Sequence, residues 1–299
     1  MKYAVLGAAG QLGREVCARL SGDVSALTRQ NIDLSRPETI RPVLSGLRPQ
    51  VLINCAAYNL VDRAETESAA AFAVNAHGVR QLAVVCRELD CSLVHFSSDH
   101  VFGLDQRRSP YTETDLPGPV NVYGTSKLAG EYLLRASCPR HFVIRTCGLY
   151  GLWGSGGKGG NFVETMLKMA AAGKPLRVVA DQVCTPTYAA DLANAVLALL
   201  DTNHYGLYHL TNTEACSWYE FAGALFKLAG VEADLKPITS AEYAAAAPRP
   251  GYSVLNTASY ETLGLAPLRS WREALGTYLQ EKRLKTNMKT ESPSATPIR

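Results

Sequence analysis

The sequence predicts an α/β fold in which a doubly wound parallel sheet is joined to a smaller α/β C-terminal part. Short apolar runs alternate with helix-like patterns from the first residues onward, which is typical of right-handed βαβ crossovers. Residues 51–54 are apolar almost throughout, as expected of a strand that helices cover on both faces. The chain has 299 residues, of which 47% are hydrophobic, so it can bury a core of the size such a sheet needs.

The elements are assigned in chain order from the spacing of apolar residues. A helix follows the first strand, with Leu12, Val16 and Leu20 four residues apart. A longer helix runs through Phe72 and Leu89, and a third covers about residues 124–135. The strands expected between and around these helices are residues 3–6, 24–27, 51–54, 92–97 and 141–146.

The C-terminal half is less regular. Residues 151–160 are rich in glycine and are expected to form a mobile loop, either a lid over a substrate or a plain surface loop. Ser217 and Glu220 form a capping-box pattern, which predicts a helix that ends at Gly230. Residues 286–299 are polar and carry two prolines, so we expect a disordered tail.

Composition and charge exclude several classes of protein. The formal net charge is only +3, which predicts neither a nucleic-acid partner nor binding to an anionic membrane. No apolar run approaches the roughly 18 residues of a membrane span, and the start is too short for a signal peptide. The eight cysteines form no Cys-x-x-Cys pair and the six histidines have no zinc spacing. We therefore expect a cytoplasmic protein without disulfides or an assigned metal site.

Three glycines form the first candidate site. Gly7, Gly10 and Gly13 follow the first strand and open the first helix, with Gln11 and Leu12 in the same turn. Glycines there allow a tight turn and close approach of the backbone to a pyrophosphate, which the helix N-terminus attracts. An ordinary strand-to-helix turn is the alternative, but the position directly after the first strand favours a Rossmann-like NAD(P) site.

The end of the second strand bears on the choice of cofactor. An NAD site usually carries an acidic residue there, on the ribose 2′-hydroxyl, whereas this chain has Arg29. Arg29 either pairs with a 2′-phosphate or is a plain surface arginine, and the residues alone leave both open. Asp33 and Leu34 are placed with the cofactor as well. NADPH is therefore the expected cofactor, with NADH as the alternative.

The second candidate site contains Tyr123 and Lys127. Residues four apart on a helix share a face, so the Lys127 ammonium is expected to lower the pKa of the Tyr123 phenol from about 10. Tyr123 then donates a proton to a carbonyl oxygen, and Ser98, which follows a predicted strand, orients that oxygen. Tyr-x-x-x-Lys alone is more typical of a surface helix, but the glycine turn and Ser98 upstream favour catalysis.

With these motifs, the sequence resembles the dTDP-4-dehydrorhamnose reductases of the extended short-chain dehydrogenase/reductase class, over about residues 1–280. Residues 61–65 and 121–131 are fairly specific to these reductases, whereas the glycine turn and the Tyr-Lys pair belong to the whole class. The other segments that carry the resemblance are residues 54–58, 97–103, 145–146, 160–162, 181–182, 186–187 and 249–253.

The resemblance implies reduction of the 4-keto group of dTDP-4-dehydro-β-L-rhamnose to dTDP-L-rhamnose with NAD(P)H. It implies Ser98, Tyr123 and Lys127 as the catalytic residues. The additional residues it places at the cofactor are Ala56, Ala57, Tyr58 and Asn75. The residues it places at the nucleotide-sugar substrate are Val61, Asp62, Ser98, Asp99, Asn161 and Arg249.

Two positions depart from the family pattern, and they leave alternatives open. Many members have Tyr where this chain has His100, and commonly Ser-Trp where it has Cys147 and Gly148. Another nucleotide-sugar 4-ketoreductase, a 4-epimerase or a non-catalytic NADP-binding regulatory subunit remain alternatives. A 4,6-dehydratase is disfavoured, because an Asp-Glu pair would follow Ser98. Some members bind Mg²⁺, and the chain is expected to be a monomer or homodimer.

These assignments divide the chain by role. Residues 1–150 are expected to form the NAD(P)-binding Rossmann domain, which also receives strands or helices from about residues 177–215. Residues 151–176 and 216–285 are expected to form the substrate-binding part. Residues 286–299 are the predicted tail.

Overall fold

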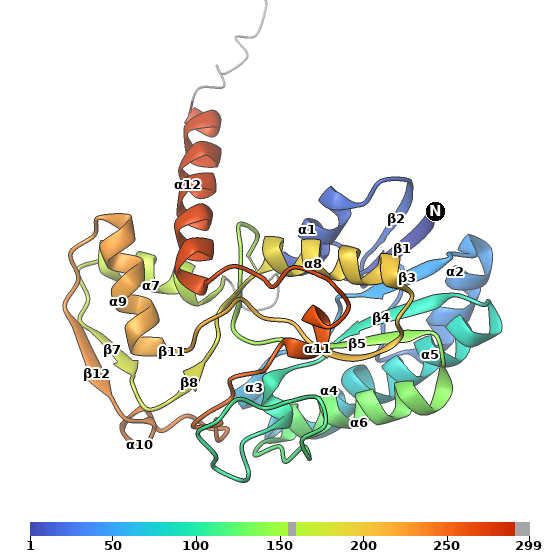
Figure 1. Ribbon diagram of the computed structural model, residues 1–299, viewed down its shortest axis with the longest axis horizontal. Helices are drawn as coiled ribbons and strands as arrows, with labels where there is room; N and C mark the ends of the chain where they lie inside the picture. Colours follow the sequence, from blue (N-terminus) through green and yellow to red (C-terminus); the bar gives the residue numbers. More distant parts are fainter. Residues whose placement is uncertain (155–159, 291–299) are drawn as a thin grey trace, which may run out of the picture.

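A six-stranded parallel sheet is the centre of the molecule in the computed structural model, which describes residues 1–154 and 160–290 (Figure 1). Its strand order is β10-β5-β4-β3-β1-β2, and each neighbouring pair is parallel. The strands are β1 (Lys2–Leu6), β2 (Asp23–Leu27), β3 (Val51–Asn54), β4 (Ser92–Phe96), β5 (His141–Arg145) and β10 (Gly206–His209). The predicted strands are thus confirmed to within two residues at their ends.

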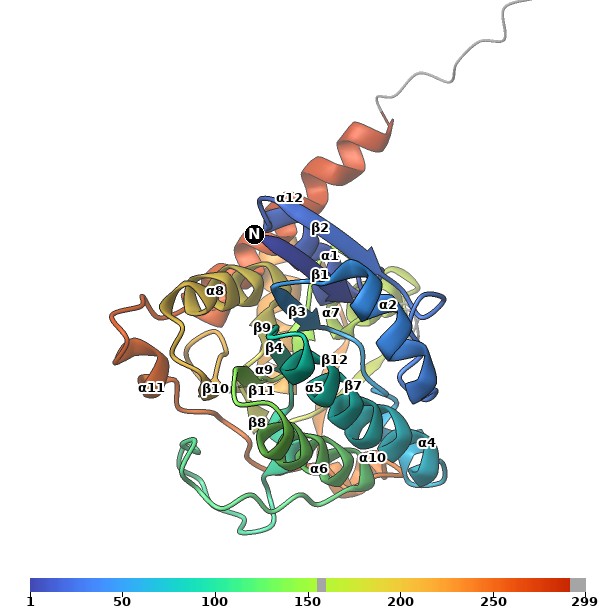
Figure 2. The same ribbon diagram turned by 90° about the vertical axis from the view of Figure 1, so that its right-hand side faces the viewer.

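Helices cover both faces of this sheet (Figures 1 and 2). Successive strand residues point to opposite faces, so Ile53 joins one apolar core and Leu52 the other. The first core is covered by α1 (Gln11–Arg19) and α8 (Ala189–Thr202). The second is covered by α2 (Ile40–Leu47), α5 (Val79–Glu88) and α6 (Val122–Ser137). The predicted doubly wound fold is confirmed.

The predicted long helix contains a π segment. α4 (Ser68–Phe72) continues into the π segment Ala73–Gly78 and then into α5. Among the described residues, the run Ser68–Glu88 is the one helix long and apolar enough to cross a membrane by length and composition. Half of the window that passes this test is buried inside the protein. Length and composition alone do not distinguish such a helix from a core helix.

The second part of the molecule lies beside the carboxyl ends of the strands (Figure 1). It has its own apolar core, which includes Tyr150, Phe221 and Trp271. Ser217 and Glu220 form the predicted capping box, and the helix ends at Gly230 with φ +67°. Its elements are β6 (Leu149–Tyr150), α7 (Phe162–Ala171), β7 (Leu176–Val179), β8 (Val183–Cys184), β9 (Thr187–Tyr188), β11 (Cys216–Ser217), α9 (Trp218–Ala229), β12 (Leu235–Ile238), α10 (Ser240–Tyr243) and α12 (Trp271–Thr290). The remaining short helices of the molecule are α3 (Val61–Ala64), α11 (Ala258–Glu261) and the 3-10 turns Pro37–Thr39 and Asp99–Val101.

The chain passes between the two parts more than once. β7 pairs with β12 and β8 pairs with β11, so residues 176–184 pack with the second part. The chain returns to the large sheet only with α8 and β10, later than residue 177. At the C-terminus, α12 runs to Thr290, so the first five residues of the predicted tail are helical. Residues 291–299, and residues 155–159 of the predicted mobile loop, lie outside the described residues.

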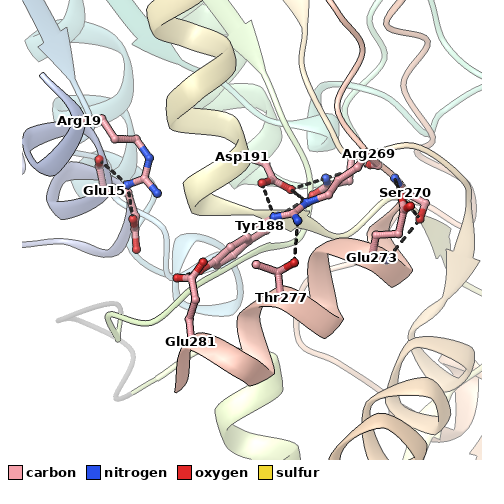
Figure 3. Close-up of polar contacts among 10 residues, drawn as sticks. Glu15, Arg19, Tyr188, Asp191, Arg269, Ser270, Glu273, Thr277 and Glu281 are labelled. Carbon is pink, nitrogen blue, oxygen red and sulfur yellow. Dashed lines mark hydrogen bonds and ion pairs between the residues drawn. The ribbon is translucent and has the colours of Figure 1, made fainter. Parts of the chain in front are cut away.

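Polar contacts join α12 to α8 (Figure 3). The Arg269 guanidinium, just before α12, donates to the Asp191 carboxylate of α8 at 2.7 and 2.9 Å and to Thr277 at 2.6 Å. The Tyr188 hydroxyl donates to Glu281 of α12 at 2.8 Å. These bonds hold the second part against a helix that covers the large sheet.

Candidate active site

The glycine turn brings three backbone segments into contact. Gly7 has φ +78°, and a Cβ there would lie 2.8 Å from the Ala56 nitrogen. A Cβ at Gly13 would lie 2.2 Å from the Gly7 carbonyl oxygen. Gly10 is the N-cap of α1, and within the described chain no side chain caps it. The turn therefore needs glycine, and it presents backbone N–H groups where a phosphate can approach.

The segment after β3 lies beside this turn and is held by Asn75. The Asn75 amide accepts from the Tyr58 N–H and donates to the Tyr58 carbonyl, both at 2.9 Å, and it donates to Ser126 at 3.0 Å. Asn75 lies in the π segment and is 1% exposed. Its polar atoms are thus engaged in joining the Ala56–Ala57–Tyr58 loop to α6, so any influence on a cofactor acts through the loop.

Arg29 and Asp33 are brought to each other. The Arg29 Nε lies 3.1 Å from an Asp33 carboxylate oxygen, and the Arg29 side chain is 81% exposed. Burial on its own would raise the pKa of Asp33, but hydrogen bonds from Ser35 and Arg29 outweigh it and lower the pKa. Leu34 is buried against Gly78, where a Cβ would lie 2.4 Å from the Leu34 carbonyl oxygen. Arg29 therefore remains at the surface with a carboxylate partner.

Ser98, Asp99 and Tyr123 form a hydrogen-bonded cluster. Ser98 follows β4, and Tyr123 lies in the first turn of α6. The Ser98 side chain lies close enough to the Tyr123 hydroxyl to act on its pKa, and the Ser98 hydroxyl donates to Asp99 at 3.0 Å. The His100 ring meets the Tyr123 ring edge to face, with centroids 5.5 Å apart.

Asp99 connects this cluster to the second part. Its carboxylate also accepts from the Cys147 thiol at 3.0 Å and from the Ser253 hydroxyl at 2.6 Å. Asp99 is 5% exposed. Because three protein donors occupy its oxygens, Asp99 is placed to hold Ser98 in position rather than to reach a sugar directly.

The pKa of Tyr123 does not move in the expected direction. Burial raises it to about 12, the hydrogen bond with Ser98 opposes the rise, and the charges of Asp99 and Cys147 add to it. The sequence-based expectation was a lower pKa, caused by Lys127. The Lys127 ammonium instead donates to the Phe96 carbonyl at 2.5 Å, at the end of β4. Lys127 is therefore not among the groups that shift the pKa of Tyr123.

Lys127 lies in a buried polar pocket with neutral partners. Its side chain is 1% exposed, and its Nζ lies 3.4 Å from Nε2 of His95. Burial lowers the pKa of Lys127 to about 8, although the charge of Glu131 opposes the shift. Within the part of the chain that the structure describes, no carboxylate lies at ion-pair distance from Lys127.

A second polar cluster unites two residues expected at the sugar nucleotide. Asp62, in α3, pairs with both terminal nitrogens of Arg249 at 3.0 and 2.8 Å, and it also accepts from the Ala247 N–H at 3.1 Å. Val61 begins the same short helix. The segment 247–253 is therefore tied to the first part at Asp62 and, through Ser253, at Asp99.

Asn161 has a different environment from the one expected. It is the N-cap of α7, where its side chain accepts from the Glu164 N–H at 3.0 Å. Its amide donates to Gln11 and to the Gly151 carbonyl, both at 2.9 Å. Asn161 is 9% exposed, so it joins the glycine turn of the first part to the second part.

Sequence reasoning missed four buried contributors to this site: Asn54, His95, Cys147 as a hydrogen-bond donor, and Ser253. Ser253 lies in a segment that carried the family resemblance, so that signal could have found it. His95 lies in β4 among apolar neighbours, and a polar residue inside a buried strand is the signal that could have found it.

The site suits a nicotinamide dinucleotide, because the glycine cradle and the backbone donors beside it match what a pyrophosphate needs. It does not supply a metal centre: within the described residues no group of three His, Cys, Asp or Glu side chains could hold an ion. Fold, glycine turn and the Ser98–Tyr123 cluster together define an oxidoreductase of the extended short-chain dehydrogenase/reductase class.

Comparison with known proteins places the chain within that class. The model of the RmlD substrate binding domain family matches residues 1–284. The chain is 40% identical to dTDP-4-dehydrorhamnose reductase of Mycolicibacterium smegmatis, covering 92% of this chain and 84% of that one. It is also 40% identical to spore coat polysaccharide biosynthesis protein SpsK of Bacillus subtilis, over 94% and 98% of the two chains. The chain belongs to the RmlD family, that of the dTDP-4-dehydrorhamnose reductases.

Solved structures agree with this assignment. dTDP-4-dehydrorhamnose reductase of Bacillus anthracis, in complex with NADP, superposes with a TM-score of 0.90 at 37% identity, covering 94% of this chain and 100% of that chain. A UDP-glucose 4-epimerase of Thermus thermophilus, in complex with NAD, has a TM-score of 0.80 at 24% identity over 95% and 99% of the two chains. At that identity the epimerase shows only that the fold is shared.

Proposed function

We propose that this protein reduces the 4-keto group of dTDP-4-dehydro-β-L-rhamnose to give dTDP-L-rhamnose, with NADPH as the reductant. The observation that carries the proposal is the Ser98–Tyr123 hydroxyl pair, joined to Asp99 at the carboxyl end of β4. Ligands of open α/β sheets bind at this edge. Relatives of this chain at 36–40% identity carry the name dTDP-4-dehydrorhamnose reductase.

The residues that would hold the cofactor lie around the glycine turn. The backbone N–H groups of Gln11 and Leu12 at the start of α1 would receive the pyrophosphate, because those of Gly7 and Gly10 already donate to the Leu27 and Gly7 carbonyls. Gly7 and Gly10 would let the phosphate approach the turn closely, and the Ala56–Ala57–Tyr58 loop would lie beside it. Arg29 would exchange part of its contact with Asp33 for a 2′-phosphate, which supports NADPH over NADH. NADPH supplies a hydride to a carbonyl carbon when bound. The solved structure of the Bacillus anthracis relative is a complex with NADP, which supports a nicotinamide cofactor here.

Tyr123 is the proposed general acid. As a carbonyl carbon is reduced, negative charge develops on its oxygen, and an unprotonated alkoxide in a partly dry site is costly. The raised pKa of Tyr123 keeps the phenol protonated at neutral pH. An alkoxide is more basic than a phenolate, so the proton moves readily from Tyr123 to the new hydroxyl. Ser98, whose hydroxyl proton is donated to Asp99 in the structure, would turn that proton to the same oxygen when the sugar binds.

The substrate side is formed by segment 247–253. Arg249 and Asp62 are proposed to contact the nucleotide sugar together with Val61, since their ion pair is partly exposed. Gly148 has φ +54°, and a Cβ there would lie 3.1 Å from Trp218. A residue larger than glycine at position 148 would therefore press against the Trp218 ring. Trp218 is the aromatic side chain next to Gly148, where many family members have tryptophan.

The test is to supply purified protein with NADPH and dTDP-4-dehydro-β-L-rhamnose and to follow NADPH consumption beside product formation. One NADPH should be consumed for each dTDP-L-rhamnose formed. Other dTDP-4-keto-6-deoxy sugars belong in the same panel, because a 41% identical relative from Streptomyces antibioticus is named as a probable 4-ketoreductase of a different dTDP sugar. Epimerised sugar without net NADPH loss would identify a 4-epimerase. NADPH binding without turnover of any sugar would identify a regulatory subunit.

A further inference from the structure

Three buried side chains form a hydrogen-bonded row beneath the site. Asn54 at the end of β3, His95 in β4 and Lys127 in α6 are each at most 1% exposed. The Asn54 amide nitrogen lies 3.0 Å from Nδ1 of His95, and Nε2 of His95 lies 3.4 Å from the Lys127 Nζ. Polar groups so deeply buried must satisfy each other, which restricts where the protons lie.

The orientation of the Asn54 amide follows from its other partner. The Ala56 backbone N–H donates to the Asn54 side-chain oxygen at 3.1 Å. The amide nitrogen therefore faces His95 and donates to Nδ1, which must be unprotonated to accept. Burial, and then the charge of Lys127, hold the pKa of His95 well below its usual value, so the ring is neutral. A neutral ring without a proton on Nδ1 carries it on Nε2.

The Nε2–H of His95 then faces Lys127. An N–H group and an ammonium are both donors and cannot bond to each other. The uncharged amine of Lys127, in contrast, has a lone pair that accepts from Nε2–H while one of its own N–H groups donates to the Phe96 carbonyl. The row of hydrogen bonds is complete only when Lys127 is neutral.

A second histidine beside a buried cation shows the opposite arrangement. Nε2 of His209 also lies 3.4 Å from a cation, the Arg145 guanidinium. Its Nδ1 lies 3.1 Å from the Tyr111 carbonyl oxygen, which can only accept. The proton of His209 therefore sits on Nδ1, and Nε2 is left to accept from Arg145. The imidazole of His209 accepts a hydrogen bond from the charged Arg145, whereas the imidazole of His95 donates toward Lys127 and disfavours a charge there.

We propose that His95, held by Asn54 in its Nε2–H tautomer, is a positioning residue that stabilises the uncharged amine of Lys127. Lys127 is thereby a group that gains and loses its proton close to neutral pH. Burial alone already lowers the pKa of Lys127 to about 8, and the hydrogen bond from His95 acts in the same direction. The charged groups around the pair are Glu131 on α6, which favours the ammonium, and Arg145 on β5, which is bound to Glu131.

The tautomer is measured directly by the ¹⁵N shifts of the histidine rings, with His95→Gln and His209→Gln used to assign the two buried resonances. His95 should show a protonated Nε2 and His209 a protonated Nδ1. A protonated Nδ1 on His95 in the unaltered protein overturns the proposal. This measurement needs no substituted protein to be active, and it needs no substrate, so it is independent of the proposed function.

The consequence for Lys127 is measured by titrating its side-chain NMR signal. In His95→Gln the amide oxygen can accept from the ammonium, so the pKa of Lys127 should rise by about one unit or more. Asn54→Asp should act in the same direction, because a carboxylate there draws the ring proton to Nδ1. His209→Gln is the matched control and should leave the pKa unchanged. An unchanged pKa in folded His95→Gln overturns the proposal.

The kinetic arm rests on the proposed function. The pH at which turnover changes with the Lys127 proton should move upward in His95→Gln by the same shift as the NMR titration, and should not move in His209→Gln. If the NMR shift is present and no sugar is turned over, the proposed function fails while the role of His95 stands. If turnover is present and its pH profile fails to move with the NMR pKa, the role of His95 in catalysis is refuted.

Discussion

Two buried cations lie close together at the carboxyl end of the sheet and are treated in opposite ways. Arg145, 2% exposed, is bound to the Glu131 carboxylate at 2.7 and 3.0 Å and lies over the Phe102 ring at 4.9 Å. Lys127, on the same helix as Glu131 and one turn before it, has the Phe96 carbonyl and the His95 ring as partners. The charge of Arg145 is paired with a carboxylate, whereas Lys127 has only uncharged hydrogen-bond partners.

The difference separates scaffold from chemistry. In a buried ion pair with complete hydrogen bonds, each charge is matched by its partner, and the pair fixes the geometry of the groups around it. A buried cation with neutral partners has a shifted pKa, which is characteristic of functional sites. Glu131 is near enough to either cation to influence it, but its carboxylate accepts hydrogen bonds from Arg145 and Ser97. Glu131 thus pairs with Arg145, and Lys127 keeps a lowered pKa, so that its protonation changes near pH 8.

The largest effect is expected on the chemical side of the comparison, from Tyr123→Phe. The change removes the proton donor and keeps the ring, so turnover should fall by roughly 10²–10⁴, the usual range for a positioned general acid. Folding and NADPH affinity should be retained. The measurement is turnover beside NADPH affinity. Near-parental turnover would contradict the role of Tyr123 and favour a regulatory subunit.

On the scaffold side, Glu131→Gln should lower the free energy of unfolding by about 3–5 kcal/mol, because it leaves the Arg145 charge buried without its partner. Urea unfolding measures the change. Glu88→Gln is the control: Glu88 pairs with Arg41 at the surface, where solvent screens the charges and such a pair contributes little to stability. Equal effects of the two substitutions would show that the buried pair is no more than a surface contact in energy.

The poised lysine predicts a pH dependence of stability. The pKa of Lys127 is about 8 in the folded chain, whereas the ordinary value for lysine is 10.5, so the unfolded chain binds more protons between these values. The free energy of unfolding should therefore rise with pH from 8 to 10.5, by an amount on the order of 3 kcal/mol at most. Lys127→Met should lose this rise, and it should also weaken NADPH binding and turnover. The difference between the two unfolding curves across this window isolates Lys127 from the other titrating groups, and parallel curves would count against a lowered pKa.

The smallest expected effect concerns an exposed cation. Arg29→Ala should raise the Michaelis constant for NADPH about tenfold, at the low end of charged hydrogen bonds because Arg29 is exposed and shared with Asp33. The constant for NADH should change less. Arg36→Ala, which removes another exposed arginine paired with a carboxylate, is the control. Equal changes for both cofactors would leave Arg29 a plain surface arginine.

Local patterns explain what could be predicted from the sequence. Apolar spacing identified the strands and helices, and the glycine turn and the Tyr123–Lys127 helix are short motifs whose geometry is set within a few residues. The bond from Ser253 to Asp99 spans 154 positions, so no local pattern contains it. The direction of the Tyr123 pKa depends on burial and on where the Lys127 ammonium points, which only the folded chain determines. Asn161 caps α7, a role that asparagine commonly has directly before a helix, but its bonds to Gln11 and Gly151 join distant segments that no local pattern contains.

The π segment Ala73–Gly78 makes the number of residues between α4 and α5 critical for the orientation of α5. An α-helix turns by about 100° for each residue, and a π segment accommodates an extra residue without losing the direction of the helix on either side. Asn75 reaches both Tyr58 and Ser126 from within this bulge. Deleting a single residue from it would rotate α5 by about a quarter turn and carry the apolar side chains Leu82 and Val85 off the sheet. In evolution or in engineering, this region should therefore tolerate insertions and deletions poorly, and it should accept substitutions only away from Asn75, with its hydrogen bonds to Tyr58 and Ser126, and Gly78, with its close contact to Leu34.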